Sequence, residues 1–426
     1  MSKASCIISC PIDTYSGYGA RSRDFVKAVI DARPDWDVKI IAQRWGNTRF
    51  GYLQDHSDYD LAGRIIPNLT SQPDVWIQIT VPNEFQAVGK YNIGVTAGIE
   101  TTLCHADWIA GCNRMNLILT SSQHSKKVLQ QTVWTLEDNR TKQKQEIKCK
   151  TPVEVLFEGL RTDVYFKTKD VDLPALSTIP EKFCFLFVGH WMQGDFGEDR
   201  KNVGYTIKAF LECFKNKSNP PALLLKTHQV GTSILDRERI LDKIDQIRNS
   251  VKGSLPNIYL LHGEMNDKEI NQLYNHPKVK AMVSFNKGEG FGRPLLEFTS
   301  TGKPVLASNW SGQIDFLNKE YCFLVGGELN NVHHSAAVDK VLLKEAKWFK
   351  PDDGQVGAVL KACFKTYKDF LTKSRKHTKY TKDNFSYEKM VEEIDRLFKL
   401  AIPEFAEKVE LSLPKLSLPK LKKIDG

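Results

Sequence analysis

The stretch Lys287-Gly-Glu-Gly-Phe-Gly-Arg-Pro-Leu-Leu-Glu-Phe-Thr-Ser-Thr-Gly-Lys-Pro-Val305 contains a glycine-rich loop, a short helix and the start of a strand. The apolar run at 279–285 precedes it and predicts a buried strand, and the run at 303–308 predicts the next strand. Gly288, Gly290 and Gly292 allow a tight loop whose backbone can approach a ligand. Pro294 suits the first turn of a helix, where its missing N–H is not needed. The stretch therefore predicts a strand–loop–helix–strand unit of an α/β fold.

Two glutamates belong to this unit. Glu289 lies on the loop at the carboxyl end of the predicted strand, and Glu297 follows eight residues later, one turn into the predicted helix. Free N–H groups and the positive end of the helix dipole point into the same space. Such a place suits a phosphorylated ligand whose hydroxyls the two carboxylates bind. The alternative is an ordinary turn that merely needs glycine, and two glutamates beside three glycines argue against it.

The pattern Glu-Gly-Phe-Gly-x-Pro-x-x-Glu resembles the signature of retaining nucleotide-sugar glycosyltransferases with the GT-B fold, most closely family 4 (E-x7-E). This resemblance implies that Glu289 binds hydroxyls of the donor sugar and that Glu297 accepts hydrogen bonds from the ribose. It also implies that backbone N–H groups around Gly290, Phe291 and Gly292 meet the sugar or the diphosphate.

Length and composition set limits on the protein. A chain of 426 residues, 41% hydrophobic and 26% charged, is normal for two globular domains. No run approaches about eighteen apolar residues, and the N-terminus lacks a secretory signal, so we expect no membrane span. Nine cysteines without a Cys-x-x-Cys pair favour reduced thiols and a cytoplasmic location. The net charge of +9 permits an anionic partner, such as nucleic acid or a membrane surface, but a nucleotide-sugar is already anionic.

The first predicted strand leads into a glycine loop that opens an amphipathic helix at 14–30. Gly17 and Gly19 resemble the family's loop beneath the donor diphosphate and the acceptor. Arg21 or Arg23 could neutralise phosphate there, and the alternative for each is a solvated helix face. The loop lacks the third glycine and downstream acid of a dinucleotide fingerprint, which excludes a nicotinamide enzyme.

Further strands of a first domain are predicted at 5–10, 37–42, 75–79, 92–100 and 153–157. Glu100 stands at the end of one of them, where the family places a residue that contacts acceptor or sugar, and His105 is the alternative for that role. Asp58-Tyr-Asp60 is a D-x-D triplet of the kind that metal-dependent transferases use. It lies in a polar loop away from the glutamates, so chance explains it better. The lysine-rich segment 137–150 predicts an exposed excursion.

A second domain opens with the apolar run 183–189, which is typical of a buried parallel strand. The family has an Arg directly after the glycine of this strand and a Lys several residues later, and both hold the donor phosphates. This chain has His190 in the Arg position. We therefore expect Lys201 to fit the Lys position and Arg200 to supply the missing bidentate donor. Two more strands are predicted at 223–227 and 258–262, and His262 is a candidate contact to the nucleotide base.

The chain is predicted to divide into three parts. Residues 1–170 form an acceptor-side Rossmann-like domain, residues 181–400 form a nucleotide-sugar-binding Rossmann-like domain, and residues 401–426 form an extended tail. The tail contains the unit Leu-Ser-Leu-Pro-Lys twice, and its prolines exclude a regular helix. Residues 361–389 are heavily basic, which usually marks a solvated helix face.

Residues and resemblance together predict the α/β class and the GT-B fold, with two domains facing each other across a donor/acceptor cleft. The expected function is transfer of a sugar, with retention, from a nucleotide-sugar donor to a hydroxyl of a glycan, lipid or protein. The diphosphate would leave beside Lys201, Arg200 and helix N-termini, and would itself take the acceptor's proton. No cofactor and no metal are expected, because fixed cations replace the metal.

Three alternatives stay open. A sugar-nucleotide epimerase or a phosphorolytic enzyme can share this fold. A catalytically inactive binding protein is the second alternative, against which both glutamates argue. The third is an acceptor in the form of a modified base in DNA, which the basic segments permit. Peripheral contact with a membrane is also compatible with the charge.

Overall fold

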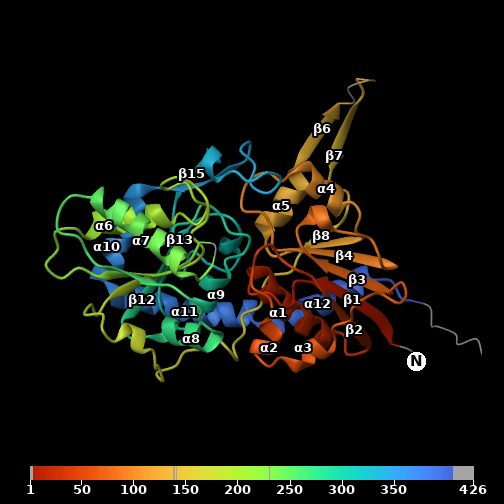
Figure 1. Ribbon diagram of the computed structural model, residues 1–426, viewed down its shortest axis with the longest axis horizontal. Coiled ribbons are helices and arrows are strands. Elements are labelled where there is room, and N and C mark those ends of the chain that lie inside the picture. The colour runs from red at the N-terminus through yellow and green to blue at the C-terminus, as the bar shows by residue number, and fades with distance from the viewer. Residues whose placement is uncertain (1–2, 138–139, 141, 230, 406–426) are drawn as a thin grey trace, which may run out of the picture.

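The computed structural model describes residues 3–137, 140, 142–229 and 231–405 and contains two α/β domains side by side (Figure 1). The repeated proline-containing unit at 411–420 lies outside the described residues. None of the described helices is long and apolar enough to cross a membrane.

The first domain is built on a six-stranded parallel sheet with the order β2-β1-β3-β4-β5-β8. Its strands are β1 (Ala4–Cys10), β2 (Trp36–Ala42), β3 (Val75–Ile79), β4 (Tyr91–Thr96), β5 (Leu117–Thr120) and β8 (Val153–Val155). The helices of this half are α1 (Gly17–Ala32), α2 (Tyr52–Asp55), α3 (Tyr59–Gly63), α4 (Ala106–Cys112) and α5 (Gln123–Gln131). Ile7 and Ile8 belong to two different buried clusters because successive side chains of a strand point to opposite faces. Both faces of the sheet are therefore covered, as expected for a parallel sheet.

The second domain repeats this architecture with the strand order β11-β10-β9-β12-β13-β14, again entirely parallel. Its strands are β9 (Cys184–Val188), β10 (Ala222–Lys226), β11 (Ile258–Leu261), β12 (Val279–Ser284), β13 (Val305–Ser308) and β14 (Phe323–Val325). Its helices are α6 (Val203–Phe214), α7 (Ile234–Asn249), α8 (Asp267–Asn275), α9 (Arg293–Thr299), α10 (Asp353–Lys365) and α11 (Tyr367–Phe385). The predicted strand–loop–helix–strand unit is β12, α9 and β13, and the predicted pair of Rossmann-like domains is confirmed.

The last helix, α12 (Tyr387–Ala401), packs against the first sheet rather than the second. Met390, Ile394 and Phe398 lie four residues apart and form one apolar stripe that joins the core beneath α1. The Phe398 ring stacks on Trp36 with a centroid distance of 5.5 Å. The sequence predicts 181–400 as one unit, but the chain crosses between the domains twice.

Two antiparallel ribbons stand apart from the sheets. β6 (Val133–Glu137) and β7 (Lys144–Lys148) form a hairpin that projects from the first domain (Figure 1), so the excursion predicted at 137–150 is exposed. β15 (Gly327–Asn331) pairs with β16 (Lys347–Pro351) on the second domain. The segment between β15 and β16 forms a small apolar cluster that contacts Leu103 and Trp134 of the first domain. Short 3₁₀ helices occur at Pro82–Glu84, Pro174–Leu176, Gly312–Asp315 and His334–Ala336.

Candidate active site between the two domains

A cleft with a volume of ≈ 870 Å³ lies between the domains. It opens beside the carboxyl ends of strands from both sheets, which is where open α/β sheets bind ligands. The first domain lines it with Tyr15, Ser16, Gly17, Trp45, Asn47, Thr48, Arg49, Tyr52 and His56. The second domain lines it with Val188, Gly189, His190, Lys226, His228, Gly231, Thr232, Gly263, Glu264, Met265, Asn266, Asp267, Glu269 and Ile270. The two domains therefore face each other across a cavity, as predicted.

The start of α1 forms part of the first-domain wall. Ser16 caps this helix by accepting a hydrogen bond from the N–H of Gly19 at 2.9 Å. Gly17 is the first helical residue and borders open space, whereas a Cβ on Gly19 would lie 2.2 Å from the carbonyl oxygen of Thr14. Gly19 is thus required by the fold, and Gly17 brings backbone N–H groups of the first turn to the cleft.

The two arginines of α1 have structural partners instead of facing the cleft. Arg21 is 1% exposed and donates to the carbonyl oxygens of Leu156 and Phe157. Arg23 is 8% exposed and donates to the carbonyl oxygens of Ile12 and Thr14. Since their guanidinium groups satisfy buried carbonyls, neither is available for phosphate. The prediction that one of them neutralises phosphate is wrong.

Four predicted site residues come together in one group, which we call the Glu289 cluster: Glu100, Arg200, Lys201 and Glu289. Lys201 forms an ion pair with one carboxylate oxygen of Glu289, and Arg200 Nη1 lies 3.5 Å from the other. The same Arg200 nitrogen lies 3.3 Å from Glu100 Oε1, so the group joins both domains. Residues widely separated in the sequence thus form a compact set of two cations and two anions.

The backbone holds this cluster in place. The N–H of Lys287 donates to the carbonyl oxygen of Arg200 at 2.9 Å, and Arg200 Nη1 donates to the carbonyl oxygen of Gly288 at 2.8 Å. Asn202, which precedes α6, has left-handed backbone geometry and donates to the carbonyl oxygen of Phe285 at 2.8 Å. The loop after β9 and the loop after β12 are therefore fastened to each other at the position of the two cations.

Electrostatics keep Glu289 ionised. Burial opposes its ionisation, but Lys201 and Arg200 outweigh burial and hold the pKa of Glu289 below its usual value. A Cβ on Gly189, which lines the cleft, would lie 3.8 Å from Lys201 Cδ, so the cluster lies directly beneath the cleft wall. Burial and the same two cations lower the pKa of His190 in that wall. His190, the residue in the family's Arg position, is therefore neutral near pH 7.

Two glycines of the central loop pack closely against the first domain. A Cβ on Gly288 would lie 2.0 Å from the carbonyl oxygen of Glu100, and one on Gly290 would lie 2.2 Å from that of Ala97. The loop backbone thus approaches the first domain rather than open space. Phe291 packs on a neighbouring ring, and Gly292 has a φ of 98° and caps α9. Gly288 and Gly290 therefore lie at the interface between the domains, whereas Phe291 and Gly292 pack within the second domain, and none of the four lines the cleft.

Glu297 lies in a second buried group, which we call the interdomain network: Asp24, Glu158, Tyr274, Arg293 and Glu297. Arg293 Nε donates to Glu297 Oε1 at 2.8 Å, and the Tyr274 hydroxyl donates to Oε2 at 3.3 Å. Arg293 Nη2 lies 2.5 Å from Asp24 Oδ2, and Nη1 lies 3.8 Å from Glu158 Oε2. Burial raises the pKa of Glu297 to about 7, although Arg293 opposes the shift. The two glutamates of one motif thus occupy different sites.

Several cleft residues escape sequence reasoning. His228 and His190 lie with ring centroids 4.1 Å apart, and burial together with His190 lowers the pKa of His228 to about 4. Lys226 ends the apolar strand β10 and His228 follows it, so the sequence signal available for both was a polar residue at the carboxyl end of a strand. Arg49 spans the cleft with an ion pair to Glu264 at 2.9 Å. It comes from an irregular loop that carries no comparable signal.

His262, His105 and the two aspartates of the D-x-D triplet are also not among the residues that line the cleft. His262 Nε2 is 3.0 Å from Asp236 Oδ2, and both side chains are almost fully buried. His105 caps α4 by accepting from the N–H of Asp107, so Glu100 is the residue of this segment that reaches the site. Asp58 pairs with Lys27 at 2.7 Å and Asp60 with Arg64 at 3.5 Å, in agreement with the D-x-D triplet being a coincidence.

Comparison with known proteins agrees with this architecture. A sequence model of the family described as "Glycosyl transferases group 1" matches residues 251–350, which include both glutamates of the motif. Comparison with curated protein sequences finds no match.

Solved structures resemble almost the whole chain at low sequence identity. A glycosyltransferase from Rickettsia africae has a TM-score of 0.63 and 13% identity, covering 94% of this chain and 99% of its own. Anabaena HepE in complex with UDP-glucose has a TM-score of 0.60 and 11% identity, covering 93% and 99%. Sucrose-phosphate synthase from Thermosynechococcus elongatus has a TM-score of 0.60 and 12% identity, covering 93% and 98%. The chain therefore has the GT-B fold and contains a segment similar to group 1 glycosyltransferases.

Proposed function

We propose that the protein is a glycosyltransferase that moves a sugar from a nucleotide-sugar to a hydroxyl acceptor, with retention of anomeric configuration and without a metal. The observation that carries this proposal is the Glu289 cluster, fixed beneath the wall of an interdomain cleft in a GT-B fold. The E-x7-E spacing supports a relationship of the chain to glycosyltransferase family 4. Anabaena HepE, which has the same fold, forms a complex with UDP-glucose.

The cleft suits an anionic donor of this size. Its volume of ≈ 870 Å³ is within the usual range of small-molecule sites, about 300–1,000 Å³. In the proposal, the diphosphate lies at the start of α1, where the N–H groups at Gly17 and the helix dipole favour negative charge. Lys226 lines the same cavity, and an anionic donor there would compete with Glu264 for Arg49. The nucleoside then lies against the second domain, between β10 and α8.

In the proposed reaction, the bond from the anomeric carbon to the diphosphate oxygen breaks, and a bond from that carbon to the acceptor oxygen forms on the same face. The acceptor's proton passes to the departing diphosphate. Glu289 holds hydroxyls of the sugar, and Lys201 and Arg200 stabilise the charge that develops on the leaving group. These cations are fixed by buried ion pairs, so we expect no catalytic metal. All nine cysteines are free thiols, which supports the proposed cytoplasmic location.

The test is product analysis with a panel of UDP-, GDP-, ADP- and TDP-sugars. The proposal predicts slow nucleotide release from one of them, faster release with an acceptor, and loss of both in Glu289→Gln. Glu345→Gln removes an exposed carboxylate of the second domain and serves as the matched control. Conversion of the sugar without release of nucleotide would indicate an epimerase instead. Release that depends on inorganic phosphate would indicate a phosphorolytic enzyme, and binding without release an inactive binding protein.

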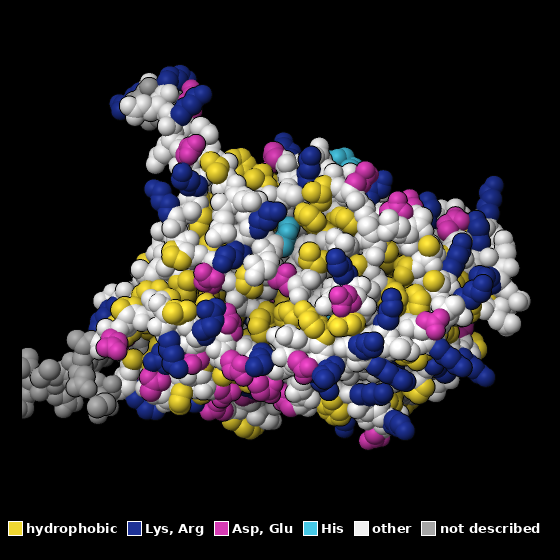
Figure 2. Space-filling view, turned by 180° about the vertical axis from the view of Figure 1, so that it is seen from behind, with side chains coloured by type: hydrophobic (Ala, Val, Ile, Leu, Met, Phe, Trp, Pro, Cys, Tyr) yellow, Lys and Arg dark blue, Asp and Glu magenta, His cyan; other side chains and the backbone are white. Residues whose placement is uncertain are grey.

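A polyanionic acceptor, such as a modified base in DNA, is the second candidate because of the charge on α10 and α11. Residues 361–382 contain eight Lys and Arg and one Asp. Within the described part of the chain, none of these eight cations forms an ion pair; they are Lys361, Lys365, Lys368, Lys373, Arg375, Lys376, Lys379 and Lys382. Figure 2 shows Lys and Arg side chains gathered on the second domain. Such an unpaired basic face suits a phosphate backbone.

A further inference from the structure

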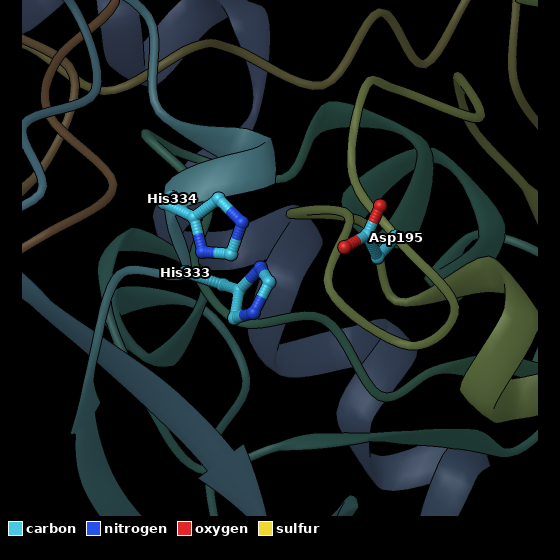
Figure 3. Close-up of side chains that lie close together, drawn as sticks. All are labelled: Asp195, His333 and His334. Carbon is cyan, nitrogen blue, oxygen red and sulfur yellow. The ribbon is translucent and has the colours of Figure 1, made fainter.

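A group of potential metal ligands lies outside the cleft, where the loop between β9 and α6 meets the segment between β15 and β16. Asp195 comes from the loop, and His333 and His334 come from the segment (Figure 3). One carboxylate oxygen and one nitrogen of each ring lie within 4.8 Å of one another. The two rings are 4.2 Å apart between centroids, and the carboxylate faces them across a short gap.

Ser335 orients the His333 ring and the loop of Asp195 through hydrogen bonds. Its hydroxyl lies 2.8 Å from His333 Nδ1 and accepts a hydrogen bond from the N–H of Asp195, also at 2.8 Å. Gln193 Nε2 donates to the carbonyl oxygen of Ser335 at 3.1 Å. One serine therefore fixes both the His333 ring and the loop that carries the carboxylate. In the structure Nδ1 accepts from the N–H of Ser335 at 3.3 Å, so binding a metal through Nε2 requires the tautomer in which Nδ1 carries the proton and donates it to the Ser335 hydroxyl instead.

The three side chains, Asp195, His333 and His334, are not engaged in ion pairs with other described residues. Asp195 and His334 are exposed and His333 is half-buried. An ion could therefore bind without first breaking a salt bridge, and exposed side chains can rotate to meet it.

We propose that Asp195, His333 and His334 bind a divalent transition-metal ion, with Zn²⁺ as the best match. Two imidazoles and one carboxylate suit Zn²⁺, whereas Mg²⁺ prefers oxygen ligands throughout. Zn²⁺ has bonds of about 2.1 Å and holds its ligands roughly 3.4 Å apart, so small side-chain rotations would close the group around it. Water completes the coordination.

The ion would act as a cross-link. Asp195 lies five residues before Arg200 on the same loop, so the metal would tie the loop that carries the two cations of the Glu289 cluster to the segment between β15 and β16. The three ligands do not belong to the residues that line the cleft. The site is therefore structural and compatible with transfer that needs no metal.

Calorimetry tests the site directly. Untagged protein stripped with EDTA and then titrated with ZnCl₂ near pH 7 should bind one equivalent, and millimolar MgCl₂ should leave that binding unchanged. His333→Ala/His334→Ala should abolish it, and Ser335→Ala, which keeps every ligand, should weaken it about tenfold. His276→Ala removes a half-buried histidine elsewhere in the domain and should bind as the wild type does.

Absence of binding, or equal binding by the double variant, would overturn the proposal and leave only adventitious surface contacts. Zn²⁺ should also raise the melting temperature of the wild type but not of the double variant. If the alanine variant fails to fold, His333→Gln/His334→Gln replaces both ligands with polar side chains of similar size and gives the same decision. The readout is binding, so the result is independent of the proposed transferase activity.

Discussion

Glu289 and Glu297 belong to one motif and are both more than nine-tenths buried, yet their surroundings differ. Glu289 faces two cations, Lys201 and Arg200, directly beneath the cleft wall. Glu297 shares Arg293 with Asp24 and Glu158 of the first domain. The first carboxylate is held ionised, whereas burial raises the pKa of the second to about 7.

The two glutamates of the motif therefore lie in different electrostatic surroundings, and we expect them to have different roles. In the Glu289 cluster, two positive and two negative charges balance next to a cavity, so a ligand can exchange with the ion pairs. In the interdomain network, Arg293 holds carboxylates from both domains together. We therefore expect changes in the network to act first on stability and changes in the cluster to act first on catalysis.

The largest effect on stability is expected for Arg293→Met. It leaves Asp24 and Glu297 buried without their shared cation, and breaking a buried ion pair costs about 3–5 kcal/mol. Arg161 remains 3.3 Å from Asp24, and Glu297 can take up a proton, so we expect the lower half of this range. Urea denaturation at pH 7 measures it.

The matched control is Arg396→Met, which removes an exposed arginine paired with Glu393 and should cost less than about 1 kcal/mol. Equal losses in the two variants would contradict the role of Arg293 in joining the domains.

A smaller effect is expected in the pH dependence of stability. Between pH 4.5 and about 7, the folded chain holds a proton on Glu297 that the unfolded chain has released. Raising the pH through this window therefore lowers the free energy of unfolding, by up to roughly 3 kcal/mol. Glu297→Gln should flatten this part of the profile, measured by urea denaturation from pH 4 to 8.

Glu289→Gln should change the free energy of unfolding on the acidic side of that window. The pKa of Glu289 is lowered in the folded chain, so its contribution is present above the usual glutamate pKa and is lost only as the pH falls below it. A Glu297→Gln profile that parallels the wild type between pH 5 and 7 would contradict the account.

Sequence reasoning recovers what depends on local pattern. Short apolar runs predict most strands of both sheets, although not β5 or β14, and the loop glutamate follows from its place after β12. The carboxylates that share Arg293 with Glu297 are not predictable in this way, because Asp24 and Glu158 lie more than 130 residues away. The apolar stripe of α12 shows that one face is buried but not which sheet it covers. Arg21 and Arg23 look like solvent-exposed charges until the carbonyls that they satisfy are known.

The smallest effect is expected for surface lysines and arginines, and it depends on whether they form ion pairs with carboxylates. Lys368, Arg375, Lys379 and Lys382 lie opposite the buried face of α11, whereas lysines of the β6–β7 hairpin pair with glutamates, as Lys142 does with Glu137 at 3.5 Å. If the acceptor is DNA, alanine at those four positions of α11 should reduce the salt dependence of binding by about 0.9 log–log units per lost phosphate contact.

Alanine at Lys142, Lys144 and Lys148 of the hairpin, which pair with Glu137 or Glu146, and at the adjacent Lys150 removes the same number of charges and should leave that slope unchanged. Fluorescence anisotropy with duplex DNA across a salt series measures both variants. Equal salt slopes in the wild type and both variants would show that none of these cations contacts DNA, and would remove DNA as the second candidate.

The central claim is that Glu289 acts on the reacting sugar in the cleft, and its most direct test is the turnover and donor affinity of Glu289→Gln beside Glu297→Gln. The substitution in Glu289 should lower turnover about a hundredfold or more, with donor affinity within a few-fold of the wild type. Glu297→Gln should instead weaken donor binding by about 1–3 kcal/mol if the donor ribose reaches that carboxylate. A folded Glu289→Gln protein with full turnover would contradict the account.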